Sequence, residues 1–222
     1  TIDDLIDFTP ELRAQAVAAI EGFRIGPLYT PPSVSVSGGN RGTIVRPGAS
    51  RGANWSGAAV DPETGMLYVP SRNLMSIFRL EPPPPDQKSN LQYMEARVGG
   101  SPVLQGLPLF KPPYSRMTAI NMNTGDHAWM VPLGDGNNVR NHPLLKGLNL
   151  PPVGGDSSLS GPLLTKTLLI SALTRGGTDD GPRLVARDKS TGEEIASVDL
   201  PGAAIGTPMT YMIDGVQYIA LT

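Results

Sequence analysis

The chain has 222 residues, of which 39% are hydrophobic, so it is long enough to bury a substantial core. Its 18 basic and 20 acidic residues give a net charge of −2, which argues against nucleic acid as a partner because no surplus of positive charge is available. The absence of cysteine excludes disulfides and thiolate metal sites, and no apolar stretch approaches the roughly 20 residues that a membrane-spanning helix needs.

One helix is predicted, close to the N-terminus. Thr9 suits the position that caps a helix, Pro10 suits the first helical position, and apolar residues then recur at helical spacing. Residues 30–50 are rich in Pro, Gly and Ser, which predicts an extended segment with one short strand at 43–45. We therefore assign residues 1–51 to an N-terminal helix and a loop-rich segment.

The remaining residues, 52–222, contain two alternating patterns. The first is a hairpin, in which a turn containing residues such as Asp, Pro, Gly or Lys joins two β-rich runs. The second is a strand, an Asn- or Ser-Thr-Gly turn, and another strand. Hairpins are predicted at 54–71, 161–171 and 208–220, and Thr-Gly segments at 118–129 and 185–196.

A hairpin and a Thr-Gly segment together make four strands in 40 to 50 residues, which is typical of a β-propeller blade. We expect an all-β fold with antiparallel four-stranded blades around 52–134 and 158–200, and an incomplete blade in the final hairpin. Long insertions near 80–115 and 134–158 are predicted to be surface excursions. Because a closed propeller needs roughly four to eight blades, we expect the chain to be a fragment.

The Thr-Gly segments resemble the tryptophan-docking motif of the quinoprotein alcohol and glucose dehydrogenases, in which an indole packs on the peptide plane of the next blade. The first segment matches the motif at Ala119, Thr124, Gly125 and Trp129. The second segment has alanine at the tryptophan position, so aliphatic contacts are expected there instead; its matching residues and that alanine are Ala186, Asp188, Thr191, Gly192 and Ala196.

Three further stretches, residues 24–32, 54–62 and 206–211, are similar to the C-terminal half of the glucose-dehydrogenase-like branch of this family. The resemblance implies about two and a half blades of an eight-bladed periplasmic propeller that carries pyrroloquinoline quinone (PQQ) and calcium or a related ion. It implies a sugar or alcohol substrate and a downstream electron acceptor, either the quinone pool or a cytochrome. It also implies that the catalytic aspartate and ion-binding carboxylates lie upstream of Thr1, so the isolated chain is expected to be inactive.

The leading candidates for contact with the cofactor are Arg72 and Asn73, which follow the first hairpin. Relatives that resemble this chain place a quinone-contacting asparagine at about this point. An amide can donate to a quinone oxygen and a guanidinium can neutralise a carboxylate. The register allows either residue, and the alternative is a pair of solvated loop residues.

Asn54 and Trp55 are further candidates, because they stand at the head of an inner strand that could face the central channel. The alternative for Trp55 is packing between blades. The sequence supplies no candidate catalytic residue and no metal ligand, because His127 and His142 lack a second ligand at metal-binding spacing. A noncatalytic propeller that serves as a scaffold for protein assembly or binding is the alternative function, and the long excursions favour the enzyme.

Overall fold

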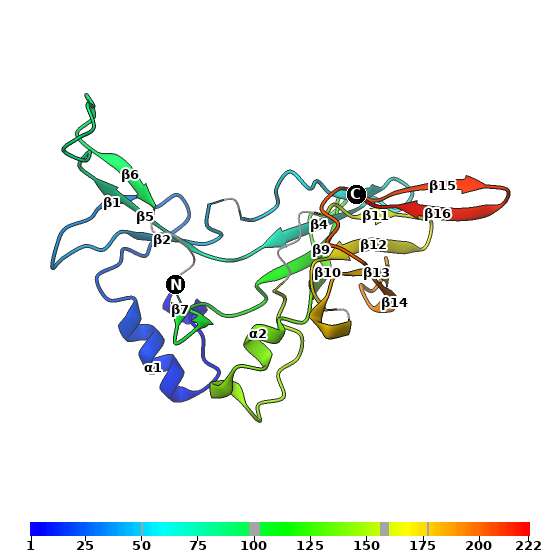
Figure 1. The fold of residues 1–222 in the computed structure, drawn as a ribbon, viewed down its shortest axis with the longest axis horizontal. Coiled ribbons are helices and arrows are strands. Elements are labelled where there is room, and N and C mark those ends of the chain that lie inside the picture. The colour runs from blue at the N-terminus through cyan, green and yellow to red at the C-terminus, as the bar shows by residue number, and fades with distance from the viewer. Residues whose placement is uncertain (50, 98–102, 156–159, 177) are drawn as a thin grey trace. The chain divides into compact units, whose positions relative to one another are not determined.

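The computed structural model describes residues 1–222 except 50, 98–102, 156–159 and 177. The protein is mostly β-structure with few helices (Figure 1). Contacts divide it into two compact units. We call Thr1–Arg51 with Asn73–Lys111 the N-terminal unit, and Gly52–Arg72 with Pro112–Thr222 the blade unit.

The blade unit contains two four-stranded antiparallel sheets and a hairpin, which confirms the predicted strand pattern. The first sheet has the order β3-β4-β9-β10, with bounds Ala59–Asp61, Met66–Arg72, Ser115–Asn121 and His127–Pro132. The second has the order β11-β12-β13-β14, with bounds Leu163–Leu164, Leu168–Leu173, Arg183–Asp188 and Glu194–Asp199. The final hairpin pairs β15 with β16, at Met209–Ile213 and Val216–Ala220.

The two sheets repeat the same register at their outer strands. Ala119 pairs with Trp129 in the first sheet, and Ala186 pairs with Ala196 in the second. Each pair lies beside an irregularity in the ladder. Ala196 therefore occupies the position that Trp129 occupies in the first sheet, as the aligned Thr-Gly segments indicate.

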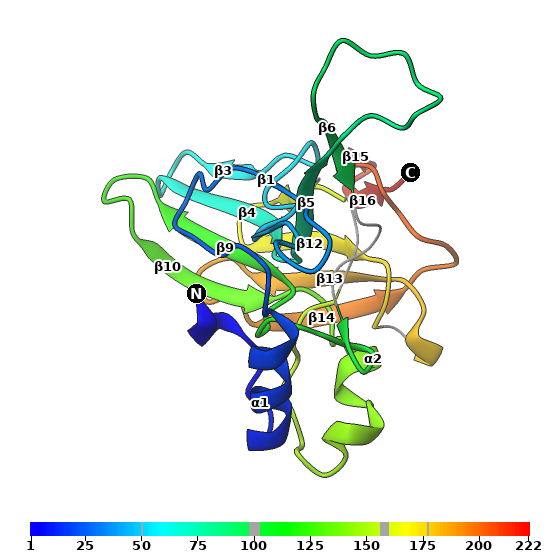
Figure 2. The ribbon, with the colours of Figure 1, turned by 90° about the vertical axis from the view of Figure 1, so that its left-hand side faces the viewer.

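A hydrophobic core joins the two sheets, which lie face to face in Figure 2. Strands of both sheets contribute apolar side chains to it, as alternation along half-buried strands predicts. The buried members are Tyr68, Met117, Ala119, Leu133, Leu169, Leu173 and Val185.

Trp129 makes the predicted contact with the next sheet. Its Nε1 atom donates a hydrogen bond to the main-chain oxygen of Lys189 over 3.2 Å. A Cβ atom built on Gly192 would lie 2.7 Å from Cε3 of the indole, so the ring lies directly against that glycine. The docking contact is therefore confirmed, and it requires glycine at position 192.

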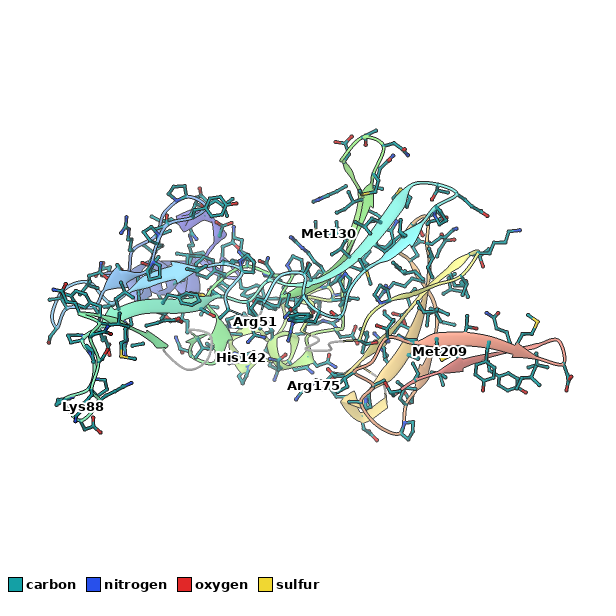
Figure 3. The ribbon with its side chains drawn as sticks, turned by 90° about the horizontal axis from the view of Figure 1, so that it is seen from above. Arg51, Lys88, Met130, His142, Arg175 and Met209 are labelled. Carbon is teal, nitrogen blue, oxygen red and sulfur yellow. The ribbon has the colours of Figure 1, made fainter. Side chains whose placement is uncertain are left out.

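Ala196 is exposed in the described part of the chain, so the aliphatic contacts expected at its blade junction stay a prediction. Strand β14 is exposed along its whole length. The hairpin β15–β16 also exposes apolar side chains, among them Met209, which Figure 3 labels on its strand.

The N-terminal unit begins with the short 3-10 helix η1 (Ile2–Asp4) and the helix α1 (Pro10–Ala19). The hydroxyl oxygen of Thr9 accepts a hydrogen bond from the main-chain nitrogen of Leu12 over 3.2 Å, which confirms the predicted N-terminal cap. The predicted strand at 43–45 is β2 (Thr43–Val45). The unit also contains β1, β5, β6, β7 and β8, at Ser33–Val34, Ser76–Glu81, Met94–Arg97, Val103–Leu104 and Leu107–Pro108.

The first excursion begins at an earlier residue than the sequence led us to expect. We expected it near residue 80, but the chain leaves after Arg72, and β5 joins the N-terminal unit. There β5 pairs antiparallel with β2 and β6, and parallel with β1. The strand β5 therefore belongs to a sheet of the N-terminal unit and not to the blade unit.

The second excursion leaves β10 and carries the short helix α2 (Asn137–Arg140) and the 3-10 helix η2 (Pro143–Leu145). Another 3-10 turn, η3 (Thr178–Asp180), follows β12. None of the helices in the described ranges is long and apolar enough to cross a membrane.

Candidate functional site

The loops that lead into β3, β11 and β15 meet at one place in the blade unit. The hydroxyl of Ser160 donates to the main-chain oxygen of Gly206 over 2.9 Å. A Cβ atom at Gly161 would lie 2.3 Å from the oxygen of Ser56 and 2.4 Å from Oγ1 of Thr207. Only glycine therefore fits at position 161.

A small depression lies next to these loops. It has a volume of about 20 Å³, about the room that one water molecule needs. It can therefore form only one wall of a site for a larger ligand. Arg72 is the charged residue of this wall, whose members are Gly52, Asn54, Ser56, Pro70, Ser71, Arg72, Ser115 and Leu133. We call these eight residues the polar wall.

The main chain holds Arg72 firmly in the polar wall. Its nitrogen donates to the oxygen of Gly52 over 3.1 Å, and the nitrogen of Gly52 donates to the oxygen of Arg72 over 2.7 Å. On its other side Arg72 pairs with Ser115 in the ladder between β4 and β9. The buried hydroxyl of Ser115 donates to the oxygen of Leu133 over 2.7 Å. The backbone of the wall is thus fixed without a ligand.

Asn54 lies in the same wall and is half-buried. Its Oδ1 atom accepts a hydrogen bond from the main-chain nitrogen of Trp55 over 2.9 Å, which leaves the amide NH₂ group as a donor. Trp55 itself is 98% exposed. Its indole is therefore exposed in this chain, and both roles weighed for it, contact with the cofactor and packing between blades, stay predictions.

Asn73 lies in the N-terminal unit, although it follows Arg72 directly in the sequence. It lines a cavity of about 290 Å³ in that unit together with Ile44 and Arg46. The Nε atom of Arg46 donates to the main-chain oxygen of Asn73 over 3.2 Å. The structure therefore brings Asn54 and Arg72 into one wall, while Asn73 lines a cavity of the other unit.

Ser115, Ser160 and Gly161 also belong to this region, although they were not among the candidates chosen from the sequence. A signal for the last two was present, because a Ser-Gly or Gly-Thr pair precedes the first strand of each hairpin: Ser56-Gly57, Ser160-Gly161 and Gly206-Thr207. Ser115 gave no such signal. Its place in this region depends on its pairing with Arg72 of β4, and the first excursion separates the two residues in the sequence.

The described part of the chain contains no group of three or more His, Cys, Asp or Glu side chains that could hold a metal ion. We therefore assign no metal ligand among these residues.

Comparison with known proteins supplies the family. Residues 1–219 match the family described as "PQQ: Glucose/ethanol/alcohol dehydrogenase, beta-propeller domain". The chain is 29% identical to the quinate/shikimate dehydrogenase (quinone) of Acinetobacter baylyi, over 99% of this chain and 28% of that protein. It is 25% identical to the quinoprotein glucose dehydrogenase A of Acinetobacter calcoaceticus, over 87% of this chain and 24% of that protein.

Among solved structures, the quinohemoprotein alcohol dehydrogenase of Comamonas testosteroni is similar, with a TM-score of 0.48 and 22% identity over 76% of this chain and 22% of that one. The chain spans about a quarter of the length of the curated relatives it matches. Because the family match covers residues 1–219, nearly the whole sequence, the chain belongs to the PQQ-dependent glucose, ethanol and alcohol dehydrogenase family, within its β-propeller domain.

Proposed function

We propose that this chain is part of a periplasmic dehydrogenase that oxidises a hydroxyl group of a sugar, an alcohol or a cyclic hydroxy acid, with PQQ as the electron acceptor. The observation that carries the proposal is the polar wall, which places Arg72 and Asn54 together beside the meeting point of three inner-strand loops. The family match supplies the class of chemistry. The quinate and glucose dehydrogenases among its relatives support the choice of substrates.

The residues of the polar wall suit PQQ, an anion with carboxylate and carbonyl oxygens. The guanidinium of Arg72 can pair with a carboxylate through two hydrogen bonds, and the amide NH₂ of Asn54 can donate to a carbonyl oxygen. The wall contains no carboxylate that would repel the cofactor. When bound, the quinone supplies the acceptor for the two electrons and the hydrogen removed from the substrate carbon.

The proposed task of this chain is to bind and orient. Arg72 neutralises charge on the cofactor, Asn54 fixes its rotation, and the exposed ring of Trp55 offers an apolar surface beside them. A general base must lie within hydrogen-bonding reach of the substrate hydroxyl, and the polar wall contains no such group. We therefore assign the base, and the carboxylates that hold calcium, to parts of the full-length protein outside the polar wall.

Arg72→Ala is expected to weaken PQQ binding about tenfold, because one charge-assisted pair is lost from the cofactor site. The measurement is a PQQ titration of the full-length protein, with the rate of dye reduction as a second readout. Asn54→Ala should weaken binding less, because a neutral hydrogen bond contributes less than a charged one. Lys166→Ala, in the exposed turn between β11 and β12, is the control.

Asn73→Ala in the same titration tests whether the N-terminal unit also contacts the cofactor. If Arg72→Ala, Asn54→Ala and Asn73→Ala all bind PQQ as tightly as the unaltered protein, the residues are solvated loop positions. A noncatalytic scaffold would then be the better account of this region.

The isolated 222-residue chain is expected neither to bind PQQ tightly nor to reduce an electron acceptor, even with calcium and glucose or quinate supplied. One wall of about 20 Å³ cannot surround the cofactor, and the polar wall contains no carboxylate or histidine that could act as the general base. The measurement is dye reduction by the purified chain. Turnover above that of free PQQ would show that the chain carries a catalytic centre of its own.

A further inference from the structure

The second excursion is anchored at the polar wall. It begins after Leu133, and on its return the main-chain nitrogen of Gly155 donates to the oxygen of Leu133 over 3.1 Å. The nitrogen of Tyr114, next to Ser115, donates to the oxygen of Val153 over 2.9 Å. The segment therefore leaves and rejoins the sheet at residues of the polar wall or next to them.

The tip of this excursion forms a pocket of about 620 Å³, a volume within the usual range for sites that bind small molecules. We call it the excursion pocket. Leu145, which is buried, contributes apolar surface to it. Its lining combines two cations, two amides and apolar residues, and contains no carboxylate: Arg140, Asn141, Pro143, Leu145, Lys146, Gly147, Asn149 and Leu150. Figure 3 labels His142, which lies on the same segment.

Arg140 is oriented by the excursion itself. Its Nε atom donates to the main-chain oxygen of Leu150 over 2.9 Å, which fixes the guanidinium at one edge and leaves its terminal nitrogens as donors. The ion pairs among the described residues use other arginines and lysines. The positive charge of Arg140 and Lys146 is thus not neutralised within the described part of the chain.

A second cavity of the blade unit provides a contrast. It has a volume of about 410 Å³ and is also lined by two arginines, Arg183 and Arg187. Both of these pair with Glu194, at 3.1 Å and 3.6 Å, and Arg183 also approaches Asp135 at 3.8 Å. The charge in that cavity is therefore already compensated, whereas the excursion pocket offers positive charge to a ligand.

We propose that the excursion pocket is a binding site for the carboxylate of a small hydroxy acid, separate from the polar wall. Arg140 pairs with the carboxylate, Lys146 adds a second positive charge, and the amides of Asn141 and Asn149 bond the hydroxyl groups. The apolar part of the lining packs against the carbon skeleton of the ligand. The proposal goes beyond the proposed function, because the excursion pocket shares no lining residue with the polar wall.

The test is a titration of the 222-residue chain with quinate and with quinate methyl ester, which shares the ring but lacks the charge. We expect quinate to shift amide signals of residues 140–150 in a two-dimensional NMR spectrum, and the ester to bind about tenfold more weakly. Inorganic phosphate is the third probe, and it should compete poorly because it offers no skeleton for the apolar lining.

Arg140→Met and Lys146→Met should each weaken quinate binding severalfold, while Lys166→Met, which removes an exposed lysine in the β11–β12 turn, should not. Lys146 is exposed, so its variant keeps the test valid even if Arg140→Met unfolds the excursion. Equal affinity for quinate and its ester, equal competition by phosphate, or unchanged binding by folded Arg140→Met and Lys146→Met would each overturn the proposal. The readout needs no PQQ, so failure of the cofactor proposal would leave it unaffected.

Discussion

Replacing Trp129 with alanine is expected to lower the free energy of unfolding by about 3 kcal/mol, the lower end of the range for such substitutions. We choose the lower end because Trp129 is half-buried. The substitution removes the indole that lies against Gly192, the hydrogen bond to the oxygen of Lys189, and a ring contact with Tyr68 at 5.8 Å between centroids. The measurement is denaturant unfolding followed by circular dichroism.

The chain contains only two tryptophans, and the other one is a matched control. Trp55→Ala should change the free energy of unfolding by less than about 0.5 kcal/mol, because Trp55 is 98% exposed. If both variants unfold at the same denaturant concentration as the unaltered chain, Trp129 does not join the two sheets.

The second large effect is expected at an ion pair beside this contact. Asp61 at the end of β3 and Lys189 after β13 meet at 2.6 Å, with side chains that are 4% and 17% exposed. The hydrogen bond from Lys189 holds the pKa of Asp61 below its ordinary value, and the same bond raises the pKa of Lys189. The pair therefore links the two sheets through charge, next to the apolar core.

The pH dependence of this stabilisation follows from the two pKa shifts. The lowered pKa of Asp61 means that its contribution is present above its unfolded-state pKa and lost as the pH falls through the folded value. The raised pKa of Lys189 means that its contribution is present below its unfolded-state pKa and lost as the pH rises through the folded value. The pair should stabilise the fold between about pH 4 and about pH 10.

Lys189→Met is expected to lower the thermal midpoint at pH 7 clearly, because it leaves the Asp61 carboxylate enclosed and unpaired. The double variant Asp61→Asn, Lys189→Met should recover part of that loss, since asparagine is neutral and can still accept the hydrogen bond from the nitrogen of Glu63. Thermal unfolding of the two single variants and the double variant measures this coupling. Additive losses would show that the pair does not couple the sheets.

Much of the blade unit was predictable because its signals are local. Turn residues at fixed offsets and alternating apolar residues predict each hairpin, and the Thr-Gly segments predict which outer strand carries Trp129. The N-terminal cap at Thr9 is local in the same sense. The departure of the chain after Arg72 was not predictable, because only the pairing of β5 with β1, β2 and β6 assigns that strand to the N-terminal unit.

The candidate site was predictable only in part, because it depends on contacts between distant segments. Asn54 and Arg72 were chosen from the sequence, and the structure places them in one wall. No local signal in the sequence indicates that Arg72 and Asn73 belong to different units. The pairing of Asp61 with Lys189 joins residues 128 positions apart and carries no sequence signal. The positive charge of the excursion pocket likewise follows from the fold, which places Arg140 and Lys146 in the lining of one pocket.

A crystal structure of the full-length protein with PQQ bound would show directly whether the polar wall holds the cofactor. We expect a terminal nitrogen of Arg72 and the amide nitrogen of Asn54 to lie within hydrogen-bonding distance of the cofactor, about 2.7–3.2 Å from its oxygens. We also expect Gly161 and its neighbouring loops to face the cofactor-binding channel. A cofactor that is bound in the protein but touches neither Arg72 nor Asn54 would show that the polar wall is not part of the cofactor site.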